Sequence, residues 1–510
     1  MSTNLPTGVS LHDVERTAGK EEHGRHDDQA QTTTATRGFR SSSWHKFLRN
    51  KDAQVNNIPF KENPKWYQNF IVVGVEENGI QPVPIEGRTS TQYNQLFTVF
   101  FTCLLSLLPV PTGMLATLSF GLSLRDASLV IIFFALITVP PTCLHGDWRN
   151  GDRHEAVFII PLLLNAATII GFSLMSAIAG GQTLAALNPS HVSVNVGIVM
   201  SCLVAFGASL LGFNFVHFWQ RWTWIPNLVA LVIAVGCGGR YLHLQTQLAA
   251  PATPTQILNL GSLVAGYFLT FGGTVGDYSI YQNPNPNPFR TGPFSARARI
   301  FSYIYFGLFL PSVPLLILGA AIGGAVPQVP AWQAAYASTG IGGVMMEMLA
   351  PAAGFGKVVL VVLALSVIGN IAISMYSISL NLEMLVPGFV RVRCVRGLRF
   401  VFILVTMAVM IPLAVQAAKE WETTLANFLS IIGYWASCFN AVLTLELVVF
   451  RRMDYITFDH GIWNVGRKLP LGLAAIGASV LSWALVAAFV VTGLLYLPSR
   501  WLEIKIRGGL

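Results

Sequence analysis

The sequence predicts an all-α polytopic membrane protein, and three observations lead to that prediction. Only 11% of the 510 residues are charged, whereas a soluble globular chain carries about 25%, and the mean hydropathy is +0.56. Apolar stretches of about 20 residues, long enough to cross about 30 Å of hydrocarbon, recur along the chain. None of them alternates residue by residue, as the strands of an outer-membrane barrel do. We therefore expect a helical bundle in a lipid bilayer.

About eleven spans follow from these stretches. They are predicted near 96–120, 127–144, 156–178, 192–212, 223–239, 257–281, 300–323, 357–383, 399–417, 427–450 and 471–497. With the N-terminal tail in the cytoplasm, the inside loops hold fourteen arginine and lysine residues and the outside loops hold four. This asymmetry follows the positive-inside rule. The net charge of +8 therefore reports topology and does not indicate nucleic-acid binding.

The segments outside the spans are polar. Residues 1–90 form a predicted cytoplasmic tail, and their composition favours disorder up to about residue 55. The transporter-like membrane domain is predicted over 91–498, followed by a short basic tail at 499–510. The six cysteines show neither metal-ligand nor disulfide spacing. We expect no metal, no cofactor and no enzyme chemistry.

Two predicted spans are interrupted inside the membrane. The interrupting residues are Pro109, Pro111 and Gly113 in span 1, and Gly272, Gly273 and Gly276 in span 6. Irregular backbone at that depth is tolerated only where it is buried or lines a cavity. Breaks at matching positions indicate a transporter built from inverted repeats, here 96–240 and 257–450, with 471–497 as an extra span. Glycine and proline are also common in ordinary membrane helices, which is the alternative for each break alone.

A polar stripe marks span 8. It consists of Ser366, Asn370, Ser374, Ser377 and Asn381, spaced so that all five lie on one helical face. For the serines, a seam between helices is the favoured interpretation. For Asn370, and with less support for Asn165 in span 3, we favour contact with a ligand, because an amide offers two donors and an acceptor.

One acid, Asp277, ends span 6 near the predicted cytoplasmic side. A gating or capping role is as plausible there as proton coupling. No acid lies in the middle of the bundle, so a proton site cannot be identified from the sequence.

Several long motifs resemble the fungal purine-cytosine permease branch of the NCS1 nucleobase:cation symporters. They include PTGMLATLSFGLSLRDASLVIIFF, HFWQRWTWIPNLVALVIAVGCGG, GDYSIY and FLSIIGYWASCFNAVLTLELVVFRRMDY, and the resemblance runs from about residue 66 to the C-terminus. It implies a LeuT-like fold, normally of 12 spans, and proton-coupled import of nucleobases across the plasma membrane, with vitamin B6 compounds as a variation. The implied partners are a small heterocyclic substrate and the bilayer.

The resemblance also implies a site between spans 1, 3, 6 and 8. Carried over by motif, the substrate contacts are Asn370 and Ser374 in span 8, Phe271 in span 6, Asn165 in span 3 and Ser106 in span 1, with Pro109 and Pro111 beside it. An aromatic face with amide edges suits a flat base with polar edges.

The chain also departs from the family pattern. Ile373 stands where the family has proline, Ser374 where it often has asparagine, and Phe271 where it usually has tryptophan. The C-terminal apolar run is too short for two spans, which places Arg500, Lys505 and Arg507 on the outer side of the membrane, against the positive-inside tendency. Because of these departures, three alternative functions remain: a diverged paralogue that does not transport, a membrane sensor, and a vitamin B6-type transporter. The sequence predicts no oligomeric state.

Overall fold

The computed structural model describes residues 93–145, 159–210, 219–246, 251–279, 296–385, 395–453, 472–482 and 488–507. These all belong to the compact unit Lys61–Leu510. Within these ranges every regular element is a helix, which confirms the all-α prediction. The predicted tail at 1–90 lies outside the described residues.

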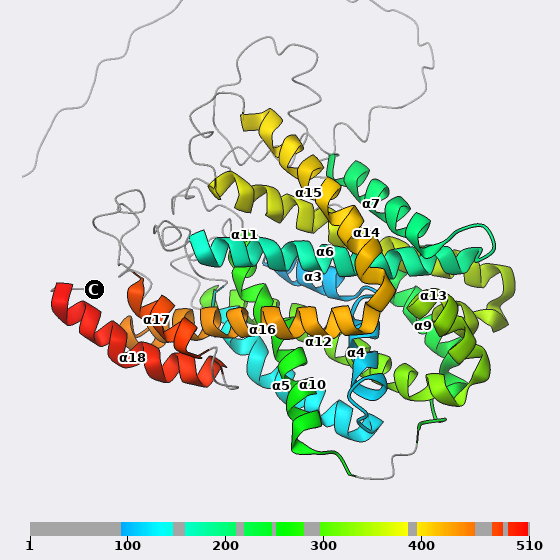
Figure 1. Ribbon diagram of the computed structural model, residues 1–510, viewed down its shortest axis with the longest axis horizontal. Helices are drawn as coiled ribbons and strands as arrows, with labels where there is room; N and C mark the ends of the chain where they lie inside the picture. The colour runs from blue at the N-terminus through cyan, green and yellow to red at the C-terminus, as the bar shows by residue number, and fades with distance from the viewer. Residues whose placement is uncertain are drawn as a thin grey trace, which may run out of the picture. The chain divides into compact units, whose positions relative to one another are not determined.

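Most of the described helices overlap a predicted span, and Figure 1 shows how they are arranged. They are α3 (Asn94–Leu104), α4 (Pro109–Leu118), α5 (Leu124–Leu144), α6 (Ile159–Leu187), α7 (Val194–Leu210), α9 (Trp224–Gly238), α10 (Pro254–Leu269), α11 (Val275–Ser279), α12 (Ala296–Ala325), α13 (Pro330–Met348), α14 (Ala353–Leu385), α15 (Val395–Ala417), α16 (Trp421–Leu445), α17 (Leu473–Ser482) and α18 (Ala488–Arg507). Among the described residues, six helices are long and apolar enough to cross a membrane, or seven if α3 and α4 form one span. The predicted number of eleven remains a prediction.

Local sequence sets where several of these helices begin. The Ser123 hydroxyl accepts the Asp126 backbone N–H at 3.1 Å and caps α5. At α10, Thr253 and Gln256 form a capping box, and proline occupies the first helical position. Such caps satisfy N–H groups that have no partner inside the helix.

Close packing between α4 and α12 explains one of the predicted break residues. A Cβ atom on Gly113 would overlap the carbonyl of Leu316, and one on Gly319 would overlap the carbonyl of Val110. Gly113 lies inside α4 and does not interrupt it. Its function is to let two helix backbones approach, as small residues do at membrane helix interfaces.

Helix α13 was not predicted from the sequence. It lies between predicted spans 7 and 8 and packs against α6. Its Trp332 is 1% exposed, and Gly340, with φ of +61°, divides it at a kink. A segment that mixes polar, small and aromatic residues gives no span-length apolar signal, so hydropathy alone could not reveal it.

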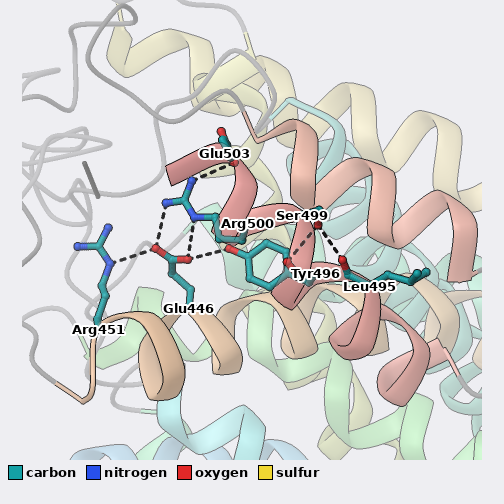
Figure 2. Close-up of polar contacts among 7 residues, drawn as sticks. All are labelled: Glu446, Arg451, Leu495, Tyr496, Ser499, Arg500 and Glu503. Atoms are coloured by element: carbon teal, nitrogen blue, oxygen red, sulfur yellow. Dashed lines mark hydrogen bonds and ion pairs between the residues drawn. The ribbon is translucent and has the colours of Figure 1, made fainter. Parts of the chain in front are cut away.

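The C-terminal apolar run differs from the prediction. The predicted span 471–497 is divided between α17 and α18, which pack against each other and against α16, and residues 499–507 continue α18 as helix. Glu446 lies in the π-helical turn Glu446–Phe450 at the end of α16. Its carboxylate forms ion pairs with Arg500 of α18 and with Arg451 (Figure 2). Both arginines are therefore at the same end of the bundle. The expectation that Arg500 lies on the side opposite Arg451 is wrong, because the chain turns back between α17 and α18.

Candidate substrate-binding site

The break in span 1 lies just before its prolines. Helix α3 ends at Leu104, α4 begins at Pro109, and the two are bent by 49°. Pro109 and Pro111 are in the first turn of α4, where the missing N–H costs no helical hydrogen bond. The predicted interruption at these prolines is therefore displaced: the backbone leaves the helix at 105–108, and the prolines restart it.

Helix α14 supplies hydrogen bonds for the backbone freed by this break. The Asn370 Nδ2 group donates to the Cys103 carbonyl at 2.8 Å and to the Ser106 hydroxyl at 2.9 Å. One turn away, the Ser366 hydroxyl accepts the Leu107 N–H at 3.2 Å. The seam predicted for the serines is thus present at Ser366.

The orientation of the Asn370 amide follows from its partners. A backbone carbonyl can only accept a hydrogen bond, so the atom facing Cys103 must be the NH₂ group. Both amide hydrogens are then used within the protein. The Oδ1 atom is left as the group that Asn370 can offer to a ligand.

The break in span 6 is a short 3-10 segment, Thr270–Gly273, between α10 and α11. A Cβ on Gly272 would overlap the Asn440 amide, and one on Gly273 would overlap the Asn165 amide. These two glycines are therefore at the predicted break and leave room for buried amides. Gly276 lies inside the short helix α11 and is buried, and Asp277 is in the same helix. The side chain of Asp277 lies outside the described set.

A cavity of about 90 Å³ lies between the two breaks. Since one water needs about 10–15 Å³ of such space, the cavity can hold several waters or one small ring. Its walls come from α3, the span 1 break, α6, α10, the span 6 break, α11 and α14. The lining residues are Val99, Phe100, Cys103, Leu104, Ser106, Leu108, Thr168, Ile169, Phe172, Ser176, Tyr267, Thr270, Phe271, Thr274, Tyr278, Asn370, Ile373, Ser374 and Ser377.

Four of the five predicted contact residues line this cavity, namely Ser106, Phe271, Asn370 and Ser374. Asn165 does not. It is 6% exposed and packs over Gly273, behind the span 6 break. Its neighbour one turn on, Thr168, lines the cavity instead, and its hydroxyl accepts the Trp435 ring N–H at 2.8 Å.

One wall of the cavity is aromatic. The Phe271 ring meets Phe100 edge-on at 6.4 Å between centroids, and lies 6.3 Å from both Phe172 and Tyr267. The Tyr278 hydroxyl lies 3.2 Å from the Ser377 hydroxyl, which joins α11 to α14. The sequence pointed to Phe271 through the resemblance, whereas Phe100 and Phe172 gave no separate signal among the many apolar residues.

The chemistry of the cavity lining is neutral. None of the described lining residues is an acid, lysine, arginine or histidine, and the described residues contain no group of three side chains that could hold a metal. Such a cavity suits an uncharged ligand with a flat apolar face and a few polar edge atoms.

Two further amides at the breaks were missed. Asn227 in α9 donates to the Leu105 carbonyl at 3.3 Å, and Asn440 in α16 donates to the Leu269 carbonyl at 2.7 Å. The signal that could have found them is the one used for Asn370, an amide within an apolar span.

Comparisons with known proteins find relatives that match most of the chain. No family model matches the chain. It is 26% identical over 440 residues to the purine-cytosine permease fcyB of Emericella nidulans, covering 83% of this chain and 82% of that protein. It is 24% identical over 444 residues to the Saccharomyces cerevisiae purine-cytosine permease FCY2, covering 81% and 79%. It is 25% identical over 468 residues to the S. cerevisiae vitamin B6 transporter TPN1, covering 86% and 77%.

The fold is shared with a solved transporter. Mhp1, a nucleobase-cation-symport-1 family transporter solved closed with bromovinylhydantoin bound, matches with a TM-score of 0.60 at 15% identity, over 85% of this chain and 96% of Mhp1. The LeuT-like fold expected from the sequence is confirmed. The chain is a multi-pass membrane transporter, not an enzyme, and its predicted similarity to the fungal purine-cytosine permeases is confirmed over most of its length.

Proposed function

We propose that the chain imports a purine, cytosine or a related flat heterocycle across the plasma membrane, together with protons, by secondary active transport. The observation that carries the proposal is the cavity between the two broken spans, whose described lining residues are all uncharged, with the Phe271 ring on one wall and the Asn370 amide on another. The similarity to purine-cytosine permeases supports the same class of substrate.

Polar recognition follows from the hydrogen bonds already made. Because the Asn370 NH₂ group is used by Cys103 and Ser106, its Oδ1 atom accepts an N–H from the substrate. The Ser106 hydroxyl accepts from Asn370, so its own hydrogen is available to a substrate carbonyl or ring nitrogen. An adjacent acceptor and donor on the protein match the N–H and C=O that neighbour each other on many nucleobases. Ser374 provides a further hydroxyl one turn along α14.

The hydrogen bonds at the same breaks support protons as the coupling ion. In transporters with broken helices, unwound carbonyls and the C-terminal ends of half-helices commonly coordinate the driving cation. Here the carbonyls of Cys103, Leu105 and Leu269 each accept an amide N–H. Each of these carbonyls has one of its two lone pairs occupied, which weakens it as a ligand for sodium and supports protons.

A vitamin B6 compound is the second candidate substrate. The 25% identity to TPN1 over 468 residues favours it, and a substituted pyridine ring also has a flat face with polar edges. A diverged paralogue that does not transport, or a membrane sensor, is the remaining alternative. It is motivated by Ile373, which lines the cavity where the resemblance implies proline.

Uptake distinguishes these possibilities. The chain is expressed in cells that lack their own nucleobase and vitamin B6 importers, and radiolabelled cytosine, adenine, hypoxanthine and pyridoxine are supplied at two pH values, with and without sodium. We expect saturable uptake of at least one base that rises at the lower pH and does not depend on sodium. Absence of uptake of all four by protein shown to be at the surface would contradict the proposal.

A further inference from the structure

Two buried amides outside the cavity hold the broken spans. Asn227 in α9 is 3% exposed, and its Nδ2 group lies 3.3 Å from the Leu105 carbonyl. Asn440 in α16 is fully buried, and its Nδ2 group lies 2.7 Å from the carbonyls of both Leu269 and Ala436. Neither asparagine lines the cavity, so direct contact with the substrate does not account for either.

Each amide is bonded to the end of a half-helix. Leu105 is the C-cap of α3, and Leu269 is the last residue of α10. The last carbonyls of a helix have no partner within it, and in a membrane interior an unpaired carbonyl is costly. Breaking either contact therefore removes a side-chain donor from the end of one half-helix.

The two half-helices belong to opposite sides of the membrane under the predicted topology. With a cytoplasmic N-terminus, α3 is the cytoplasmic half of span 1, and α10 is the outer half of span 6. The donors come from spans 5 and 10, which hold matching places in the two predicted repeats. The Asn227 contact thus fixes a cytoplasmic half-helix, and the Asn440 contact fixes an outer one.

The glycine at the span 6 break supports a specific role for Asn440. A Cβ on Gly272 would overlap the Asn440 amide, so the amide occupies space that only glycine leaves open. Helix α16 packs on both α10 and the 3-10 segment, which lets movement of α16 act directly on the break.

We propose that Asn227 and Asn440 are positioning residues for alternating access: the Asn227 contact opens when the site faces the cytoplasm, and the Asn440 contact opens when it faces the outside. This rests on the proposed transport function. Both contacts are made in the present structure, so each holds its half-helix against a neighbouring helix, α9 or α16. Loss of one contact then favours opening to one side, and loss of the other favours opening to the opposite side.

Cys103 provides a native reporter, because it lines the cavity between the breaks. The test measures the rate at which a membrane-impermeant thiol reagent, added from outside, modifies Cys103 in the full chain, with Cys103→Ala giving the background. A hydrogen bond between membrane helices is worth about 0.6 kcal/mol, so we expect shifts of about threefold. Asn440→Leu should speed labelling, and Asn227→Leu should slow it. Asn259→Leu, at an exposed position on α10, should leave the rate unchanged.

Opposite signs are the diagnostic result, because a merely structural role would move both rates in the same direction. If Asn227→Leu does not reach the surface, Asn227→Ser is used in its place. If Asn440→Leu does not, Gly272→Ala is used, because its added methyl group displaces the Asn440 amide. Changes of the same sign in both, or no change in either, would overturn the proposal. The labelling needs no substrate, so its failure is distinct from a failure of the uptake experiment.

Discussion

Replacing Asn370 by alanine tests how the substrate is recognised. The variant removes the Oδ1 acceptor that we assign to the substrate, and it also removes the two N–H donors that bond to the Cys103 carbonyl and the Ser106 hydroxyl. A buried N–H left without its acceptor costs about 1–3 kcal/mol. We therefore expect the KM for uptake of the transported base to rise about 5- to 150-fold, since about 1.4 kcal/mol corresponds to tenfold.

A methylated analogue separates recognition from damage to span 1. The assay compares the transported base with an analogue methylated at the ring N–H, in the wild type and in Asn370→Ala. The wild type should discriminate against the analogue, whereas the variant should transport both with a similar KM, as expected when the two changes remove the same interaction.

Ser366→Ala is the matched control. It removes one hydrogen bond to the Leu107 N–H at the same break, but Ser366 does not line the cavity. Its KM should change by less than about threefold, as for a single bond between membrane helices. If Asn370→Ala kept the full discrimination of the wild type, the assignment of its Oδ1 atom to the substrate would be refuted.

Three further substitutions test other parts of the account. Phe271→Ala should raise the KM for uptake about 2- to 10-fold, because it removes an aromatic contact with the substrate. Phe428→Ala, outside the cavity, should leave the KM unchanged. An equal rise in KM in both variants would argue against stacking on Phe271. Gly113→Ala should lower the free energy of unfolding by about 1–3 kcal/mol, because the added methyl group overpacks against Leu316. Gly207→Ala, where no atom lies within 4 Å of an added Cβ, should be neutral. Thermal melts of both variants in detergent measure the difference. Arg500→Met should destabilise the packing of α18 by about 3 kcal/mol, because the buried Glu446 carboxylate loses both hydrogen bonds from the Arg500 guanidinium. Protease cleavage near the C-terminus should therefore increase. Lys505→Met, at an exposed position, should not change it, and similar cleavage in both variants would refute this role for Arg500.

Much of the fold could be predicted because apolar length and breaks are local properties of the chain. The two interruptions were located to within a few residues, since proline and glycine mark them directly. The details differ because proline can restart a helix as well as interrupt one, as Pro109 does. Gly113 has a packing role that depends on α12, about 200 residues away in the chain.

The site was predicted less completely. Asn370 was found because an amide in an apolar span is costly without a partner, and the same argument led to Asn165. Only the first lines the cavity, because which face of α6 meets the cavity is set by packing. The return of the chain between α17 and α18 could not be predicted, since no polar turn marks it within the apolar run, and the pairing of Arg500 with Glu446 spans 54 residues.

Protection of Cys103 by substrate is the most direct test that transport uses this cavity. The thiol lies among the lining residues, so a bound base should shield it from a small alkylating reagent. We predict that the base taken up by the cells slows modification of Cys103, with half-maximal protection at a concentration similar to its KM for uptake. An unchanged rate of modification at a saturating concentration of that base would contradict the account.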